Sequence, residues 1–403
     1  MGLDERVVVL GMGYVGLPAA LLLAKAGCEV IAVDTDATKV QQFNSSALNL
    51  GEKELRHLVD DPTVREHLHA ESRPVPGDVF IIAVPTPVDP RKKIADLSHL
   101  EAALQSILPV LRPGNMVIVE STIPPLTCRD VITPILESTG LGVGTDLLLA
   151  HCPERVLPGD VFREITENDR LIGGTTPEAA QRAKGLYKRF VRGELLVTDD
   201  VMAEMVKLLE NTFRDVNIAL ANEIAAVAET VGIDPVEMIR LANRHPRVNL
   251  LRPGIGVGGH CIPLDPWFIK QVDPANSRLI FAARLINDEQ PYRVAAKIRR
   301  AVRDIPGPQI VAIGATYKPD VLDTRESPAI QIVELLREDG YAVRHYDHLV
   351  DGMDYPSLAE VAADADCLVI LVEHDTVNQE LASGGSEITS AMRHPLILRF
   401  YAD

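Results

Sequence analysis

The chain has 403 residues, a hydrophobic fraction of 46% and a formal net charge of −17 at pH 7. This length exceeds what one ordinary hydrophobic core supports, so two or three domains are expected. The negative charge argues against nucleic acid as a partner, but a local cluster of lysines and arginines can still bind an anionic substrate.

The cysteines and the first residues indicate the kind of compartment in which the protein works. Five cysteines are an odd number and form no CxxC pair, which favours a reducing compartment over a disulfide framework. The start, MGLDERVVVLGMG, is charged and leads into a strand, so no signal peptide is expected. No apolar run is long enough to span a bilayer. We therefore expect a cytoplasmic enzyme without a membrane partner.

The first half of the chain alternates short apolar strands with helical patterns. RVVVLG, LPAALLLAKAG and CEVIAVD form a strand–helix–strand unit over residues 6–34. Further strand-like runs follow at 79–84, 116–120 and 147–150. Such an alternation predicts a parallel sheet with helices on both faces.

The pattern changes near residue 200. Residues 200–230 lack Pro and Gly and carry apolar residues at helical spacing, which predicts one long helix. It ends near Gly232, and Asp234-Pro235 begins the next helix. Helical character continues to about residue 303, and after IPGP a second α/β pattern opens with QIVAIGAT. We expect three parts, with boundaries at 1–199, 200–304 and 305–403.

A G-x-G-x-x-G motif, Gly11 to Gly16, follows the first strand and opens the first helix. Its glycines permit a tight turn, close approach of a pyrophosphate to Gly13, and close helix–strand packing. Asp34 ends the next strand, where a carboxylate accepts hydrogen bonds from a ribose and repels a 2′-phosphate. The motif therefore predicts NAD rather than NADP, and Asp36 is a second ribose candidate. The predicted cofactor-binding residues are Gly11, Gly13, Tyr14, Val15, Gly16, Asp34, Lys39, Thr86 and Thr122.

Thr86 of VPTP and Thr122 of EST follow later strands at their carboxyl ends, where such sheets bind ligands. Taken alone, each is an ordinary loop residue.

A second group of polar residues lies on the long helix. Glu204, Lys207 and Asn211 are spaced to share one face, and this spacing alone favours a solvated charged face. The segment GIGVGGHCIPLD gives a sharper signal, because four glycines precede Cys261 and Asp265 follows it. Glycines leave room around a thiol that acts as a nucleophile. The alternative is that Cys261 is a buried small hydrophobe.

Two His-Cys pairs, at 151–152 and 260–261, raise the question of a metal. Adjacent residues on an extended chain point to opposite faces, and neither pair has zinc-ligand spacing. We expect no metal site.

Together these segments resemble the nucleotide-sugar 6-dehydrogenases, the UDP-glucose/GDP-mannose dehydrogenase family. The resemblance spans nearly the whole chain and rests on GMGYVGLP, VPTP, EST, CPERVLPGD, E-x-x-K-x-x-x-N, GVGGHCIPLDPWF and YKPDVLDTRESPA. NRHPRVN and VGGHC…DPWF are most similar to the branch that oxidises UDP-N-acetyl-D-mannosamine. HPLILRFYAD stops where relatives continue, and Pro263-Leu264 departs from the commonest form of this branch.

The resemblance implies an N-terminal Rossmann domain, a central helical dimerisation region and a C-terminal Rossmann-like α/β domain. It also implies two oxidations at sugar C6 in one site, with two NAD⁺ consumed. Cys261 would form a thiohemiacetal and then a thioester, which water hydrolyses. Lys207 would exchange a proton with the C6 oxygen or stabilise its charge, Asn211 would bond the same oxygen, and Asp265 would orient Lys207 or the water. Glu154 and Thr122 would lie near the reacting carbon.

The resemblance further implies which residues bind the UDP-sugar and which additional residue binds NAD. The substrate-binding set is Glu154, Arg155, Val156, Lys207, Asn211, Arg214, His245, Arg247, Gly258, Tyr317 and Lys318. Arg325 would reach NAD, and the loop from Gly256 to Gly259 would hold the sugar with its backbone. A homodimer or higher oligomer is expected, in which the long helix forms the core and Arg247 comes from a neighbouring subunit. UDP-N-acetylglucosamine and UDP-glucose remain rival substrates, and a non-catalytic nucleotide-sugar sensor remains an alternative of another class.

Overall fold

The computed structural model describes residues 5–48, 53–156, 161–353, 355 and 357–400, which form two compact units. Unit 1 comprises the chain up to Glu210 together with Trp267–Asp273, and unit 2 comprises Asn211–Pro266 and the chain from Pro274. Residues 157–160 of the CPERVLPGD motif and the last three residues of the chain lie outside the described residues. The predicted three-part boundaries stay a prediction.

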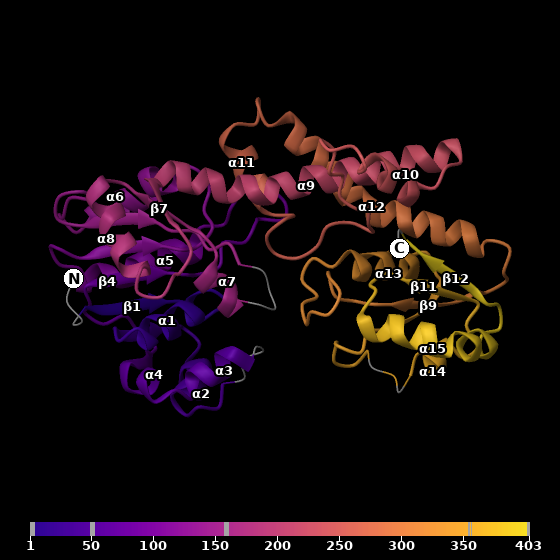
Figure 1. Cartoon of the computed structure of the whole chain (residues 1–403), viewed down its shortest axis with the longest axis horizontal. Coiled ribbons are helices and arrows are strands. Elements are labelled where there is room, and N and C mark those ends of the chain that lie inside the picture. The colour runs from indigo at the N-terminus through magenta and orange to yellow at the C-terminus, as the bar shows by residue number, and fades with distance from the viewer. Residues whose placement is uncertain (1–4, 49–52, 157–160, 354, 356, 401–403) are drawn as a thin grey trace. The chain divides into compact units, whose positions relative to one another are not determined.

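Unit 1 is built on a sheet whose described strands follow the order β3-β2-β1-β4-β5-β6-β7-β8 (Figure 1). Neighbouring strands are parallel except for β6 and β7, which are antiparallel. The strands are β1 (Arg6–Leu10), β2 (Glu29–Val33), β3 (Leu68–Glu71), β4 (Val79–Ile82), β5 (Met116–Val119), β6 (Leu148–His151), β7 (Arg170–Gly174) and β8 (Leu195–Asp199). The order 3-2-1-4-5-6 of the first six strands is that of dinucleotide-binding Rossmann sheets.

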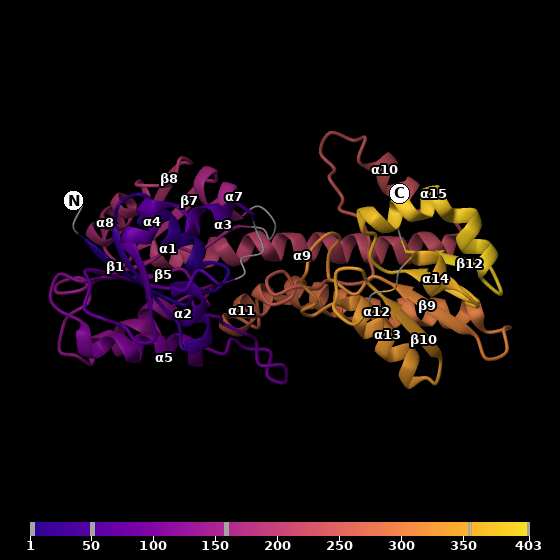
Figure 2. The ribbon, with the colours of Figure 1, turned by 90° about the horizontal axis from the view of Figure 1, so that it is seen from below.

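Helices cover both faces of this sheet. The helices of unit 1 are α1 (Gly16–Lys25), α2 (Ala37–Asn44), α3 (Lys53–Val59), α4 (Pro62–His67), α5 (Ser98–Ile107), α6 (Thr133–Glu137), α7 (Val161–Glu167) and α8 (Pro177–Tyr187). Apolar residues of α1 and α8 pack on one face, and those of α5 and α6 pack on the other. Figure 2 shows α1 and α8 on one side of the sheet and α5 on the other. Because both faces are covered, β1, β4 and β5 are almost entirely buried and apolar.

The long helix predicted from the sequence is α9 (Asp200–Val231), and the boundary between the units falls within it. Helix α10 (Pro235–Ala242) begins as expected, because the side chain of Asp234 accepts hydrogen bonds from Val236 N and Glu237 N. Helix α11 (Asp265–Val272) follows the glycine-rich segment, and α12 (Arg278–Val302) ends close to the predicted residue 303.

Unit 2 also contains a parallel sheet, in the order β10-β9-β11-β12 among the described strands (Figure 1). These strands are β9 (Gln309–Ile313), β10 (Ala342–Tyr346), β11 (Cys367–Ile370) and β12 (Leu396–Arg399). Helices α12 and α13 (Pro328–Glu338) pack on one face, and α14 (Leu358–Ala362) and α15 (Asp375–Ala391) pack on the other. The predicted α/β class with a helical centre and a second α/β part is therefore confirmed. Among the described residues, no helix combines the length and the apolar character needed to cross a membrane.

Candidate active site

The three glycines after β1 each have a separate physical reason. Gly11 has φ +100°, and a Cβ there would lie 2.4 Å from Ala83 O. A Cβ at Gly16 would lie 2.0 Å from Gly11 O, so helix and turn can pack only around glycine. At Gly13 no described residue other than its two chain neighbours has an atom within 4 Å of a Cβ, which leaves open space beside the N-terminal end of α1. This arrangement fits a pyrophosphate at Gly13.

Asp34 lies directly beside this turn. Its carboxylate accepts hydrogen bonds from Met12 N and Asp36 N, each over 3.0 Å, and lies 3.2 Å from Lys39 Nζ. Burial alone would raise the pKa of Asp34, but the two backbone N–H groups and the Lys39 ammonium outweigh it and hold the pKa below its usual value. Asp34 is therefore an anionic acceptor at the end of β2, as ribose recognition requires.

The loops after β4 and β5 are tied together at the carboxyl edge of the sheet. Ser121 Oγ accepts a hydrogen bond from Val84 N over 2.9 Å and donates to Val84 O over 2.7 Å. Thr86 Oγ1 donates to Thr122 O over 2.6 Å. The structure thus brings Thr86 and Thr122 together, in the loops after β4, which pairs with β1, and after β5, which pairs with β4.

Glu154 is held by a buried network that the sequence did not reveal. Arg170 donates to Glu154 Oε2 over 2.8 Å and to Glu120 Oε1 over 2.6 Å, and its guanidinium lies 4.2 Å from the centre of the Tyr187 ring. Tyr187 Oη donates to the same Glu120 oxygen over 2.6 Å. Burial raises the pKa of Glu120, although the Arg170 charge opposes this. Arg170 therefore pairs with both Glu120 and Glu154 and holds the Glu154 carboxylate in place.

Arg155 and Val156 follow Glu154 and are partly exposed. The Arg155 guanidinium donates to Glu210 Oε1 over 2.6 Å and to Asp169 O over 2.5 Å. A small pocket, which Glu154, Arg155, Asp169 and Arg170 help to line, lies beside this group.

One face of the first turns of α9 is buried, and it carries Glu204 and Lys207, so the solvated face expected from spacing alone is wrong for these two residues. Their exposed fractions are 0% and 7%. Glu204 accepts from Leu126 N over 2.6 Å and from Cys128 N over 2.9 Å, which ties α9 to the loop after β5. Burial raises the pKa of Glu204 to about 7, and the two N–H donors only partly oppose it.

The glycine-rich segment of unit 2 is anchored at its first residue. Gly254 N donates to Asn222 Oδ1 over 2.8 Å, and Gly254 O accepts from Gln290 Nε2 over 2.9 Å. Both side chains are buried and come from α9 and α12. This anchor fixes where the loop towards Cys261 begins.

The following glycines pack against the segment after β9. A Cβ at Gly258 would lie 2.6 Å from Glu326 O and 2.7 Å from Tyr317 Cβ, and one at Gly259, where φ is +86°, would lie 3.1 Å from the Tyr317 ring. Gly259 N also donates to Arg325 O over 3.0 Å. Contacts within the protein therefore require these two glycines, in addition to the approach of a sugar expected from the sequence.

Cys261 differs from the other four cysteines of the chain. Cys28, Cys128, Cys152 and Cys367 are each 0% exposed, whereas Cys261 is partly exposed. Burial raises the pKa of all four buried thiols, for Cys152 and Cys367 to about 12, which makes them poor nucleophiles. The alternative that Cys261 is a buried small hydrophobe is wrong.

Asn211 and Asp265 meet beside Cys261. Asn211 Nδ2 donates to Asp265 Oδ2 over 2.6 Å, and Asp265 N donates to Cys261 O over 2.9 Å. Three residues predicted to take part in catalysis thus come together: Asn211 on α9, Asp265 at the start of α11, and Cys261 in the loop before it.

The remaining predicted ligand-binding residues lie at the surface of unit 2. Arg325 is 61% exposed and pairs with Asp323 over 2.7 Å. Arg214, His245, Arg247 and Lys318 are exposed. Within the described part of unit 2, no hydrogen bond or ion pair joins the Arg214 or Lys318 side chain to the Cys261 loop.

The buried His-Cys pair of the sequence has a structural environment. His151 Nδ1 is 2.9 Å from Val119 O, and burial lowers the pKa of His151 to about 3. Cys152 beside it is fully buried. His151 is therefore a neutral core residue at the end of β6.

Comparison with known proteins identifies the family of this chain. The UDP-glucose/GDP-mannose dehydrogenase family matches in three parts, its NAD binding domain at residues 5–191, its central domain at 201–289 and its UDP binding domain at 311–400. A UDP-N-acetyl-D-mannosamine dehydrogenase from Methanocaldococcus jannaschii is 45% identical over 402 residues, which cover 98% of this chain and 92% of that protein. An NDP-N-acetyl-D-galactosaminuronic acid dehydrogenase from Ralstonia solanacearum is 42% identical over 388 residues, or 92% of each chain.

A solved UDP-D-ManNAc dehydrogenase from Pyrococcus horikoshii superposes with a TM-score of 0.92 at 40% identity, covering 98% of this chain and 95% of that one. Fold and site together define an NAD-dependent dehydrogenase. The chain belongs to the UDP-glucose/GDP-mannose dehydrogenase family, and it is an NAD-dependent nucleotide-sugar dehydrogenase.

Proposed function

We propose that this protein oxidises UDP-N-acetyl-D-mannosamine at C6 to UDP-N-acetyl-D-mannosaminuronate. The names of the relatives from Methanocaldococcus jannaschii and Pyrococcus horikoshii support this sugar. The reaction converts one alcohol, two NAD⁺ and one water into one carboxylate, two NADH and three protons. Bound NAD⁺ accepts one hydride in each of the two oxidations.

Cys261 connects the two oxidations. Its thiolate adds to the carbon of the C6 aldehyde, and the carbonyl electron pair moves to oxygen to give a thiohemiacetal. Loss of hydride from this tetrahedral carbon leaves a thioester. Water then attacks the carbonyl carbon, the C–S bond breaks, and the sulfur returns as the thiolate. The partial exposure of Cys261, against four fully buried cysteines, is the observation that carries this proposal.

The surrounding polar groups move protons and stabilise charge. Lys207 accepts the proton of the C6 hydroxyl and stabilises the oxyanions that follow, and Asn211 donates a hydrogen bond to the same oxygen. Asp265 keeps Asn211 in place and orients Lys207 or the attacking water. Glu154 and Thr122 hold the water near the reacting carbon.

The UDP portion requires cationic and aromatic partners. We assign this role to Arg155, Arg214, His245, Tyr317 and Lys318, with Val156 and Gly258 beside them. Arg325 serves NAD. The cytoplasmic location expected from the cysteines stays a prediction.

We also propose a homodimer, to which the partner supplies the residue corresponding to Arg247. An apolar stripe on α9 supports it. Phe213, Leu220, Val227 and Val231 share one helix face and are 44–66% exposed.

A panel of UDP-sugars assayed for NADH and for uronic acid tests the function. We expect two NADH per sugar and the highest kcat/KM with the N-acetylmannosamine sugar, against the N-acetylglucosamine, N-acetylgalactosamine and glucose forms. Cys261→Ser should lose acid formation, whereas a control at a buried cysteine, Cys367→Ala, should retain it. Acid formed by Cys261→Ser at the wild-type rate would rule out the covalent route. Tight UDP-sugar binding without any NADH would favour the sensor.

A further inference from the structure

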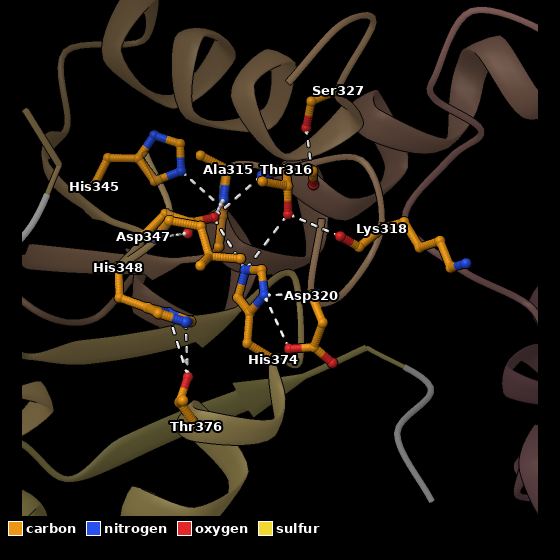
Figure 3. Close-up of polar contacts among 12 residues, drawn as sticks. Ala315, Thr316, Lys318, Asp320, Ser327, His345, Asp347, His348, His374 and Thr376 are labelled. Atoms are coloured by element: carbon orange, nitrogen blue, oxygen red, sulfur yellow. Dashed lines mark hydrogen bonds and ion pairs between the residues drawn. The ribbon is translucent and has the colours of Figure 1, made fainter. Parts of the chain in front are cut away.

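A buried pair of side chains in unit 2, Asp347 and His374, lies beside the turn that carries Tyr317 and Lys318 (Figure 3). Their exposed fractions are 1% and 0%. Asp347 directly follows β10, and His374 directly precedes α15. Two segments distant in the sequence thus meet at the carboxyl end of β9, where the turn begins.

Asp347 fixes the start of the turn. Its Oδ2 atom accepts hydrogen bonds from Ala315 N over 2.6 Å, from Thr316 N over 3.2 Å and from His374 Nε2 over 3.1 Å. Its Oδ1 atom accepts from Leu349 N over 2.9 Å. Burial alone would raise the pKa of Asp347, but the hydrogen bonds hold the pKa far below its usual value. An ionised carboxylate therefore holds the backbone at 315–316.

His374 fixes the end of the turn. Asp320 N donates to His374 Nδ1 over 3.0 Å, so Nδ1 acts as the acceptor and the ring proton is on Nε2, which faces Asp347. Asp320 has φ +58°, a left-handed conformation that is uncommon for non-glycine residues but that Asp adopts more readily than most. Thr316 Oγ1 donates to Lys318 O over 2.9 Å and closes the turn internally. Figure 3 shows the Lys318 side chain extending away from this network.

The turn also packs against the loop that precedes Cys261. Carbon atoms of Tyr317 lie 2.7 Å from the Cβ position of Gly258 and 3.1 Å from that of Gly259. These contacts leave no room for the turn to shift towards the loop. A displaced turn would therefore displace Tyr317 and the loop that precedes Cys261.

The same side chains have the composition of a metal site, because atoms of Asp347, His348 and His374 lie within 4.8 Å of one another. Their hydrogen bonds favour a different role. Both ring nitrogens of His374 are engaged, and His348 Nε2 lies 3.0 Å from Thr376 Oγ1. A cation bound to Nδ1 would displace the hydrogen bond from Asp320 N directly. A cation bound to Nε2 would also break it, because the ring proton would have to move to Nδ1.

We propose that His374 is a positioning residue of the UDP-sugar site. Through the Asp320 N–H and the Asp347 carboxylate it holds the turn 316–320, and the turn in turn sets the place of Tyr317 and Lys318. The inference rests on the proposed function, because it assumes that these two residues bind the nucleotide sugar.

Two changes at His374 and a matched control test this role. His374→Phe fills the ring volume but removes the ring's hydrogen bonds to Asp320 N, Asp347 and Thr316. His374→Asn keeps an amide oxygen for Asp320 N. The control is His394→Asn, because His394 pairs with Asp366 over 2.6 Å in the same sheet, but at the amino end of β11. The readouts are hydrogen exchange of the peptide 315–321, the Kd for UDP, and KM for UDP-sugar and for NAD.

In His374→Phe we expect faster exchange of this peptide and an about tenfold rise in both the Kd for UDP and the KM for UDP-sugar. KM for NAD should stay within about twofold. His374→Asn should restore most of the UDP affinity, and His394→Asn should leave every readout at the wild-type value. If His374→Phe does not fold, Thr316→Val removes the bond to Lys318 O and the 3.4 Å contact with His374 Nε2, and it should raise the Kd for UDP in the same direction.

Several results would overturn the inference. Faster exchange with unchanged UDP affinity would make the pair a purely structural device, and unchanged exchange would show that it does not hold the turn. Zinc that raises the Tm of the wild type but not of His374→Phe would assign the cluster to a cation. If the wild type binds UDP but oxidises no UDP-sugar, the proposed function fails, and the Kd for UDP still decides the role of His374.

Discussion

Asn211 Nδ2 donates a 2.6 Å hydrogen bond to Asp265 Oδ2, which joins α9 to the first residue of α11. Asp265 is only 3% exposed, so its carboxylate depends on such donors. Loss of a donor from a buried acceptor costs about 1–3 kcal/mol of stability. Asp265 lies four residues after Cys261, whose carbonyl oxygen accepts a hydrogen bond from Asp265 N.

Asn211→Leu should therefore lower kcat by at least about tenfold, because both the proposed oxyanion donor and the orientation of Asp265 are lost. Steady-state kinetics and thermal unfolding measure the two effects. Asn217→Leu is the matched control, because the Asn217 side chain on the same helix bonds, among the described residues, to a backbone oxygen of that helix, Phe213 O. Equal losses of kcat in the two variants would mean that the leucine disturbs the helix itself.

The buried network around Arg170 predicts a large stability effect in unit 1. Removal of Arg170 would leave Glu120 and Glu154 as buried carboxylates without their cation, so Arg170→Met should cost about 3–5 kcal/mol. In the double variant Arg170→Met/Glu120→Gln, one of these charges is gone and part of the loss should be recovered. Urea denaturation of the single and double variants measures this coupling. Strictly additive losses would contradict it.

The comparison of sequence and structure separates local from non-local features. Gly11, Gly13 and Gly16 were predictable because their turn, strand and helix are contiguous in the chain. Arg170 was not, since its carboxylate partners, Glu120 after β5 and Glu154 after β6, have no common spacing with it in the sequence. The antiparallel position of β7 was equally invisible, because strand direction depends on the path of the chain and not on strand composition.

The burial of individual side chains also could not be predicted from residue spacing alone. Glu204 and Lys207 have the spacing of a solvated helix face, and only the packing of α9 on the loop after β5 removes them from water. Asp347 and His374 lie in predicted α/β segments, but their meeting depends on the strand order of the second sheet.

Glu204 should make stability depend on pH. Its folded-state pKa of about 7 exceeds the unfolded value near 4.5, so the folded state retains a proton that the unfolded state releases between these values. Stability from this group is therefore fully present below about pH 4.5 and is lost as pH rises through 7, by about 3 kcal/mol in total. Glu204→Gln should remove this slope, so the variant gains on the wild type from pH 5 to 8. Parallel curves in urea denaturation would contradict the raised pKa.

The exposed stripe on α9 predicts self-association through unit 2. Val227 is 54% exposed, and a charge placed there would have to be desolvated in a helix–helix interface. Val227→Glu should therefore convert a dimer into a monomer at micromolar concentration, as measured by sedimentation velocity. Ile94→Glu places the same charge on an exposed apolar residue of unit 1 and should leave the dimer intact. A monomeric wild type would refute the proposed interface.

The glycine turn of unit 1 predicts that one alanine substitution lowers stability and another lowers the affinity for NAD. A methyl group at Gly16 would overlap Gly11 O, so Gly16→Ala should lower the Tm and the yield of folded protein. At Gly13 the part of the chain that the structure describes, apart from residues 12 and 14, has no atom within 4 Å of the new Cβ, so Gly13→Ala should keep the wild-type Tm. The methyl group would instead occupy space reserved for the pyrophosphate and raise KM for NAD by about tenfold or more. Calorimetry and NAD titration distinguish the two effects, and an unchanged KM for NAD in Gly13→Ala would mean that the cofactor phosphates lie elsewhere.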